Sequence, residues 1–273
     1  MKRVLSVQDL SCMGKCSLTV ALPVLSAMGC GCTVLPTAVL STHTGFPSPY
    51  RRSLTEDIGE ICCHWQSVGA RFDGIGVGYL ATPEQAEAVM AVLDAFQCLT
   101  VIDPAMADHG KLYSGLTPEQ IPAAAALCRR GQVLLPNVTE AALLTHLPYR
   151  EAADMGYYRD LVAGMMEFGP EAVIITGAAV SSGQLGFVGA HRQTGEFSYQ
   201  APLLHKKHHG TGDLFAAVVL GGLMAGQDIA ATGSLAARVV ERVLSDTLEK
   251  SSFGVEFETQ LPWLWEQLQK TGV

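Results

Sequence analysis

The stretch HHGTGDLFAA, residues 208–217, places two glycines, a threonine and an aspartate directly before an apolar, helix-like pattern. Aspartate is favoured at helix starts, so Asp213 has a plain interpretation as a helix cap. The first turn of a helix also presents free N–H groups and the positive end of the helix dipole. The amides of residues 210–212 can therefore hold an anion, with Asp213 beside it as a proton acceptor.

Short β-branched runs alternate with helical patterns along most of the chain. Buried strands are predicted at residues 3–7, 32–40, 74–80, 99–103, 133–136 and 172–176. The tetrapeptide TPEQ occurs at 82–85 and again at 117–120, and each copy predicts a helix that begins with a threonine cap and a proline in the first turn. This alternation predicts an α/β fold with a central, mostly parallel sheet and helices on both faces.

The pattern changes after residue 184. Residues 185–191 and 197–203 predict a two-stranded hairpin, and helices are expected again at 212–225, 228–250 and 261–269. No linker rich in proline, glycine or serine divides the chain, so residues 1–273 are expected to form one domain.

Composition excludes several classes of protein. With 48% hydrophobic and 16% charged residues the chain is globular rather than disordered, and a net charge of −8 argues against a nucleic-acid binder. No secretory signal and no apolar run of about 18 residues is visible, so we expect a cytoplasmic protein without a membrane span. The eight cysteines lack the paired knuckles of a zinc site and are interpreted as reduced thiols.

Nearly every predicted strand leads into polar residues. In chain order these are Asp9, the loop His43-Thr44-Gly45, Asp103 with Asp108, Asn137 with Glu140, and Thr176. The carboxyl ends of parallel strands meet at one edge of a sheet, where α/β proteins bind their ligands. We therefore expect these side chains to converge on one site.

The chemistry of this edge predicts phosphoryl transfer. Carboxylate and amide oxygens suit a hard cation, and magnesium usually takes one or two carboxylates together with substrate phosphates. Asp213 would then accept the proton of the attacking hydroxyl. Asn137 and Glu140 also fit a helix cap with its capping-box partner. Neither a P-loop nor a dinucleotide fingerprint is present: MGKCS at 13–17 lacks the required residues at positions 9 and 16, and GIGVGY at 74–79 fails at its third glycine.

Five stretches carry a resemblance to a known family. GTGDLFAA (210–217), VLSVQD (4–9), STHTG (41–45), DPAMADHGKLY (103–113) and PNVTEAALL (136–144) resemble, in order and spacing, the vitamin B6 kinases of the ribokinase-like superfamily. The resemblance runs from residue 4 to about residue 225.

The resemblance implies transfer of the ATP γ-phosphate to the 5′-hydroxymethyl group of pyridoxal, pyridoxine or pyridoxamine. It implies that Asp213 is the general base and that Gly210, Thr211 and Gly212 form the anion hole. Asp103, Asp108, Asn137 and Glu140 match positions near Mg²⁺, a monovalent cation such as K⁺ and the ATP phosphates; Asp103, Asp108 and Glu140 are the expected metal ligands. Thr176 and Tyr113 match nucleotide-side residues, and His43, Thr44 and Gly45 match the loop that holds the pyridine ring. A homodimer is also implied.

Two positions depart from the family pattern. Asp9 stands where serine is common, and Leu135 stands where threonine often precedes Pro-Asn. A carboxylate attracts a cation within about 4 Å, so our hypothesis is that Asp9 favours pyridoxamine, or a protonated pyridine nitrogen.

Several alternatives stay open at this point. A hydroxymethylpyrimidine kinase shares the GTGD context, and a vitamer- or nucleotide-binding protein without turnover is a different class. His43 fits ligand contact and a structural hydrogen bond equally well. The run HKKHH at 205–209 suits either positive charge over ATP or a solvated loop.

Overall fold

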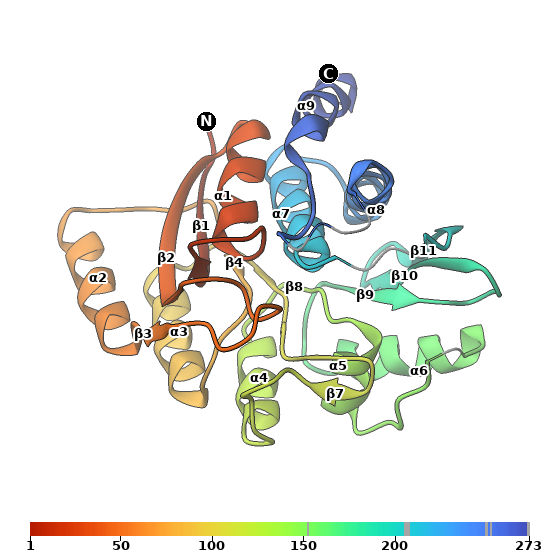
Figure 1. The fold of residues 1–273 in the computed structure, drawn as a ribbon, viewed down its shortest axis with the longest axis horizontal. Coiled ribbons are helices and arrows are strands. Elements are labelled where there is room, and N and C mark those ends of the chain that lie inside the picture. Colours follow the sequence, from red (N-terminus) through yellow and green to blue (C-terminus); the bar gives the residue numbers. More distant parts are fainter. Residues whose placement is uncertain (152, 205–207, 249–250, 252, 272–273) are drawn as a thin grey trace.

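The central sheet of the computed structural model runs in the order β11-β10-β9-β8-β5-β4-β1-β2-β3 (Figure 1). The structure describes residues 1–271 apart from 152, 205–207, 249–250 and 252. The strands are β1 (Arg3–Ser11), β2 (Gly31–Leu40), β3 (Arg51–Ser53), β4 (Gly74–Val77), β5 (Leu99–Ile102), β8 (Val133–Leu134), β9 (Ala172–Ala178), β10 (Gln184–His191) and β11 (Gly195–Pro202). The run from β9 to β2 is parallel, and β3, β10 and β11 add antiparallel edges.

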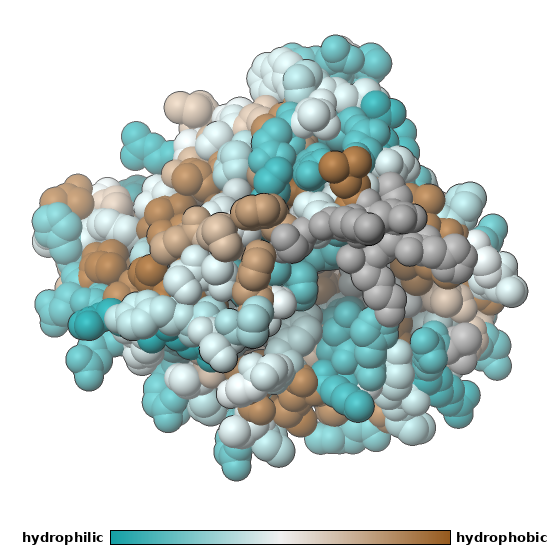
Figure 2. All heavy atoms as spheres, in the orientation of Figure 1, coloured by the Kyte–Doolittle hydropathy of each residue, from teal (hydrophilic) through white to brown (hydrophobic). Residues whose placement is uncertain are grey.

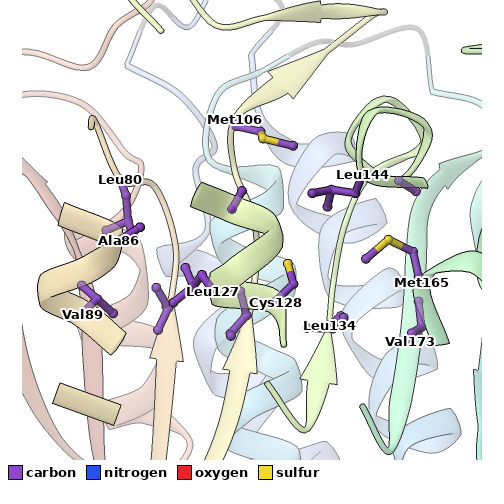
Figure 3. Packing of buried hydrophobic residues seen from close by; sticks show 14 of the residues in the cluster. Leu80, Ala86, Val89, Met106, Leu127, Cys128, Leu134, Leu144, Met165 and Val173 are labelled. Atoms are coloured by element: carbon purple, nitrogen blue, oxygen red, sulfur yellow. The ribbon is translucent and has the colours of Figure 1, made fainter. Parts of the chain in front are cut away.

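Helices cover both faces of the sheet, as predicted (Figure 1). One layer holds α2 (Thr55–Ser67), α3 (Pro83–Ala95), α4 (Gln120–Cys128), α5 (Val138–Thr145) and α6 (Met155–Met166). The other layer holds α1 (Leu18–Ala27), α7 (Thr211–Met224), α8 (Ile229–Asp246) and α9 (Leu261–Thr271), with a short 3₁₀ turn at Glu258–Gln260. Each layer buries its own apolar cluster against the sheet, and Figure 3 shows the first of these, in which Leu134 and Val173 of neighbouring strands face Cys128 and Met165.

The predicted elements are present, and several of them differ in extent. β1 continues to Ser11, so Asp9 lies inside a strand rather than after it. The predicted helix at 228–250 is observed as Ile229–Asp246, and residues 249–250 lie outside the described part. The first TPEQ caps α3 as predicted, since Thr82 accepts a hydrogen bond from the Gln85 N–H.

A helix follows the second TPEQ as predicted, but its threonine does not cap that helix. Helix α4 begins only at Gln120, and its cap residue Glu119 makes no side-chain cap bond. Residues 117–120 form a turn instead, and the Gln120 side chain donates to the Leu80 carbonyl oxygen, 3.1 Å away.

A two-stranded flap, β6 (Ala107–Asp108) and β7 (Lys111–Leu112), stands apart from the main sheet. On the face shown in Figure 2, hydrophilic and hydrophobic residues alternate over short distances. Among the described helices, none combines the length and the apolar character that crossing a membrane requires.

Candidate active site

Asp213 lies in the first turn of α7, at the carboxyl-end edge of the sheet. The cap residue Gly210 has a left-handed backbone (φ 91°), and a side chain there would collide with the Lys15 carbonyl oxygen, so only glycine fits. The chain enters α7 through this turn, and the N–H groups of the first helical turn have no hydrogen-bond acceptor within the helix. The residues Gly210, Thr211 and Gly212 therefore lie at a helix start, and their role as an anion hole stays a prediction.

Asp213 and Asp103 face the same space. Both line a small cavity between the sheet and α7, and a Cβ placed on Gly212 would lie 3.6 Å from Asp103 Oδ2. Burial raises the pKa of Asp213 to about 6, although a hydrogen bond from the Ser17 backbone N–H lowers it. Burial and the charges of Glu140 and Asp213 also raise the pKa of Asp103. These shifts fit a proton acceptor with a second buried carboxylate beside it.

Asn137 and Glu140 form the capping box of α5. The Asn137 side chain accepts from the Glu140 N–H, and Glu140 Oε2 accepts from the Asn137 N–H. Glu140 Oε1 also accepts the N–H groups of Met106 and Ala107, at 2.8 and 3.3 Å. The structural alternative for this pair is thus confirmed, and Glu140 ties the start of α5 to the flap. Its role toward the metal stays a prediction.

The predicted cation site fits magnesium that arrives with a nucleotide. In the part of the chain that the structure describes, no three His, Cys, Asp or Glu side chains gather closely enough to hold an ion by themselves. Magnesium in kinases needs only one or two protein carboxylates, because phosphates and water complete its shell. Asp103, close to two further acids, supplies such a carboxylate. Asp108 is exposed on β6 and accepts the His109 N–H.

The nucleotide-side predictions fall on two elements near these acids. Thr176 on β9 donates its N–H to the Pro136 carbonyl oxygen and pairs with Asn137. Tyr113 follows the flap, and burial together with the charges of Glu140 and Asp103 raises its pKa. Thr176 was predicted at this edge from the end of its strand, and Tyr113 was expected near the site only from the family resemblance; contact of either residue with a nucleotide stays a prediction.

Asp9 is buried on β1, at an irregularity in its pairing with β2. Bulges of this kind redirect side chains near active sites. Ser17 Oγ donates to Asp9 Oδ1 (2.5 Å), and Ser11 Oγ donates to Asp9 Oδ2 (3.0 Å). Burial raises the pKa of Asp9, while these two bonds and the Arg51 charge lower it.

The predicted substrate loop is divided between buried and exposed residues. His43 is buried, its Nδ1 accepts the Gly45 N–H, and its ring packs against Phe46 and His209. A structural role for His43 is therefore supported. Thr44 and Gly45 are exposed, and their contact with a ligand stays a prediction. In the run HKKHH, residues 205–207 lie outside the described part of the chain.

Two residues beside Asp9 were not predicted from the sequence. Arg51 on β3 lies close enough to lower the pKa of both Asp9 and Tyr79. The Tyr79 hydroxyl is buried and has no hydrogen-bond partner among the described residues. A buried unpaired hydroxyl points to a missing partner such as a ligand. No spacing or motif in the sequence links these positions to Asp9.

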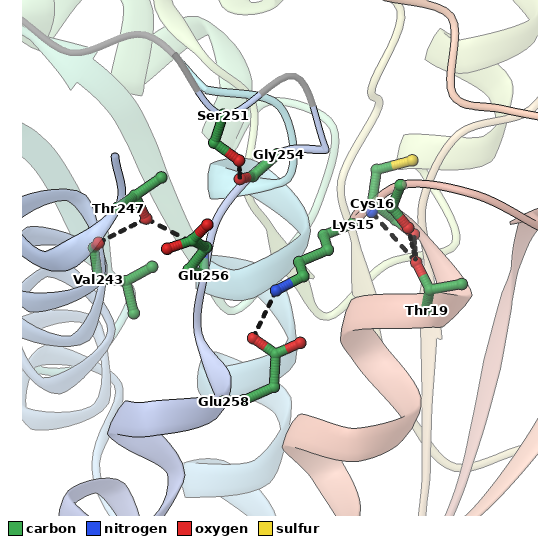
Figure 4. Close-up of polar contacts among 10 residues, drawn as sticks. Lys15, Cys16, Thr19, Val243, Thr247, Ser251, Gly254, Glu256 and Glu258 are labelled. Atoms are coloured by element: carbon green, nitrogen blue, oxygen red, sulfur yellow. Dashed lines mark hydrogen bonds and ion pairs between the residues drawn. The ribbon is translucent and has the colours of Figure 1, made fainter. Parts of the chain in front are cut away.

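The loop at 12–17 and the segment at 253–258 were also not predicted to belong to the site. The Lys15 N–H donates to the Phe253 carbonyl oxygen, and the Val255 N–H donates to that of His209. Lys15 Nζ reaches Glu258 at 2.7 Å, as Figure 4 shows. This segment therefore braces the loop against the residues just before the anion hole.

Cys16, in the same loop, is not a nucleophile. Burial and the neighbouring Asp213 charge raise the pKa of its thiol to about 12, so it stays protonated at neutral pH. All eight cysteines are free thiols, which agrees with their interpretation as reduced, and Cys30, Cys62 and Cys128 are buried.

Comparison with known proteins agrees with this geometry. The model of the phosphomethylpyrimidine kinase family matches residues 22–255. A pyridoxine/pyridoxal/pyridoxamine kinase of Bordetella bronchiseptica is 32% identical over 265 residues, covering 90% of this chain and 89% of that protein. The pyridoxal kinase of Lactobacillus plantarum has a TM-score of 0.91 and 28% identity, with all of both chains covered.

A Bacteroides thetaiotaomicron structure that contains pyridoxal also has a TM-score of 0.91, with 30% identity over 98% of this chain and 96% of that one. Family match, sequence identity and fold thus agree along nearly the whole chain. The chain belongs to the phosphomethylpyrimidine kinase family, in the vitamin B6 kinase branch of the ribokinase-like superfamily, and is an enzyme that transfers a phosphoryl group to an alcohol.

Proposed function

We propose that this enzyme transfers the γ-phosphate of ATP to the 5′-hydroxymethyl group of a vitamin B6 vitamer. The observation that carries the proposal is the position of Asp213: its carboxylate lies in the first turn of α7, shares a cavity with Asp103, and is linked through Ser17 to the buried Asp9. Base, anion site, cation site and substrate pocket thus adjoin one another.

In this mechanism Asp213 accepts the proton of the 5′-hydroxyl as that oxygen attacks the γ-phosphorus. The N–H groups of residues 210–212 bind the phosphoryl oxygens at the positive end of α7. Asp103, with Asp108 and Glu140 near it, would hold Mg²⁺, which neutralises phosphate charge when bound. Asn137, Thr176 and Tyr113 would face the nucleotide.

The substrate pocket is assigned to the other side of Asp213. Asp9, the unpaired Tyr79 hydroxyl and Arg51 offer an acceptor, a neutral hydroxyl and a cation to the pyridine ring. His43, Thr44 and Gly45 form the neighbouring loop. A K⁺ requirement is part of the proposal and is measured directly with the kinetics below.

The first test replaces the base. Asp213→Asn should lower kcat by about 10²–10⁴-fold, the usual contribution of a general base, while ATP binding is largely kept. Steady-state ADP release with pyridoxal, pyridoxine and pyridoxamine, with and without Mg²⁺ and K⁺, measures this. Near-normal turnover of the variant would reject Asp213 as the base. Vitamer-dependent ADP release by the wild type that requires Asp213 excludes a binding protein without turnover.

The second test concerns the vitamer. The buried Asp9 carboxylate should favour the protonated aminomethyl group of pyridoxamine, because opposite charges attract strongly away from water. Asp9→Ser should therefore lower kcat/KM for pyridoxamine relative to pyridoxal and pyridoxine by about tenfold, the effect of a charge-assisted hydrogen bond. An unchanged ranking of the three vitamers would show that Asp9 does not select the substrate.

The family description favours one alternative substrate. Because the matching family model is that of phosphomethylpyrimidine kinases, hydroxymethylpyrimidine is assayed beside the vitamers. A higher kcat/KM for hydroxymethylpyrimidine than for every vitamer would replace the proposed substrate and leave the catalytic assignment unchanged.

A further inference from the structure

Ser17 has a backbone conformation that serine seldom adopts. Its φ and ψ are 50° and −129°, and the Thr19 N–H donates to the Cys16 carbonyl oxygen at 3.2 Å, which closes a four-residue turn. Figure 4 shows that the Thr19 side chain braces the same turn against Cys16. These angles are those of the second residue of a type II′ turn, where glycine is usual because a Cβ is strained. Non-glycine residues in such strained conformations gather at functional sites.

The Ser17 side chain is not used for the helix that it precedes. Ser17 is the cap residue of α1, yet its side chain makes no cap bond. Its Oγ instead donates to Asp9 at 2.5 Å, and the residue is only 4% exposed. A glycine would relieve the backbone but would leave Asp9 with Ser11 as its one remaining hydroxyl partner. The Ser17 hydroxyl therefore hydrogen-bonds Asp9 instead of capping α1.

The main-chain N–H and carbonyl groups of Ser17 also have partners. Its N–H lies near enough to the Asp213 carboxylate to lower the pKa of that group, and its carbonyl oxygen accepts the N–H groups of Val20 and Ala21 at 3.0 and 2.9 Å. Every polar group of Ser17 therefore has a partner. Two of these partners are the carboxylates on either side of the proposed acceptor hydroxyl.

We infer that Ser17 is a positioning residue that ties the substrate-binding carboxylate Asp9 to the reaction base Asp213. This inference rests on the proposed function. The hydroxyl holds the Asp9 carboxylate in one orientation toward the substrate, and the N–H holds Asp213 at a fixed place relative to Asp9. The strained turn is the geometry that lets one residue reach both.

The main test is Ser17→Gly, which removes the hydroxyl, keeps the N–H and relieves the backbone. We expect the melting temperature to be unchanged or higher, KM for the vitamer to rise about tenfold, and kcat and KM for ATP to change less than about threefold. A merely structural role would lower the fraction of active protein, and so kcat, while KM stays constant. An unchanged vitamer KM overturns the inference.

The matched control is His146→Gly, at the exposed C-cap of α5, where φ is 59°. It relieves a positive φ far from Asp9 and should leave KM and kcat as in the wild type. A second variant, Ser17→Ala, removes the hydroxyl but keeps the strain, and should show the same rise in KM with a lower melting temperature. If Ser17→Gly does not fold, the KM of Ser17→Ala for the vitamer tests the same inference.

A double-mutant cycle separates action through Asp9 from an independent effect. In an Asp9→Asn background, Ser17→Gly should change KM for the vitamer less than about twofold, because the partner of its hydroxyl has already been altered. An equal, tenfold rise in both backgrounds overturns the inference. A wild-type enzyme that phosphorylates no vitamer overturns the proposed function and this inference with it, whereas wild-type turnover with unaltered Ser17→Gly kinetics overturns the inference alone.

Discussion

Asp213 lies at a helix start and is also the proposed base of the reaction. The helix dipole favours its charged form, whereas burial disfavours that form. As an acid in the first turn of α7 it interacts favourably with the helix dipole. Burial nevertheless raises its pKa to about 6, so the charged form is less favoured in the folded protein than in the unfolded chain, although it still predominates at neutral pH. A base with a pKa near the working pH is also the most effective acceptor of a proton. We therefore expect kcat/KM to fall as the pH drops below about 6.

The same shift predicts a pH-dependent stability. A raised pKa in the folded state means that the folded protein holds the proton more tightly, so this contribution is present below the unfolded value near 3.8 and is lost as the pH rises through about 6. Asp213→Asn removes the unfavourable charge, and its melting temperature should exceed that of the wild type at pH 8 but not at pH 4. Calorimetry at both pH values measures this.

Asp94→Asn is the matched control for this stability prediction. It removes an aspartate from an exposed ion pair with Arg130 and should shift the melting temperature at pH 8 only slightly. A wild type that melts higher than Asp213→Asn at pH 8 would contradict the assigned shift.

At the scale of elements, the site depends on a segment far along the chain. Residues 253–258 pack between the 12–17 loop and the residues that precede α7 (Figure 4). Gly254 has φ 104°, and a Cβ there would lie 2.7 Å from the Lys15 carbonyl oxygen and 2.9 Å from that of His209. Both contacts are main chain and cannot yield without moving the loop that Gly210 touches.

Gly254→Ala should therefore lower kcat/KM by about tenfold, because a displaced anion hole loses part of its transition-state stabilisation. Gly169→Ala is the matched control: its φ is 100°, and no atom lies within 4 Å of the added Cβ. It should carry the same backbone strain, of order 1–3 kcal/mol, and leave kcat/KM unchanged. Equal kinetics in the two variants would show that the segment does not support the site.

The polar residues at the strand ends could be predicted from the sequence, but the packing of residues 253–258 against the 12–17 loop could not. Asp103 and Asn137 follow apolar runs whose strand character is local, so their convergence could be predicted from the topology of parallel sheets. The Lys15–Glu258 contact joins residues 243 positions apart, and neither residue lies in a recognisable motif.

At the scale of the whole molecule, the two helix layers pack against both faces of the sheet. Leu134 of β8 is fully buried in the apolar cluster drawn in Figure 3. Leu134→Ala should lower the free energy of unfolding by about 2–5 kcal/mol, because it leaves a cavity beside β8. Leu185 on β10 is 40% exposed, and Leu185→Ala should change that free energy by less than about 1 kcal/mol. Urea denaturation compares the two variants, and equal losses would contradict this account of the core.

Assembly belongs to the same scale. The homodimer stays a prediction from the family resemblance, as does the formation of one domain by residues 1–273. Analytical ultracentrifugation and limited proteolysis test the two.

The α/β alternation, the acids and amides at the strand ends, and the glycine-rich start of α7 could all be predicted from the amino-acid sequence, because hydrophobic periodicity and helix-start chemistry are local properties of the chain. The three-dimensional packing places Ser17 near both Asp9 and Asp213 and brings three main-chain N–H groups to the Glu140 carboxylate. It also buries the Tyr79 hydroxyl near Asp9 with no hydrogen-bond partner among the described residues. The physical reason is that burial and pairing depend on which distant segments meet. The order of the strands and the packing of α1 against α7 bring these distant segments into contact, and no local sequence pattern predicts those contacts.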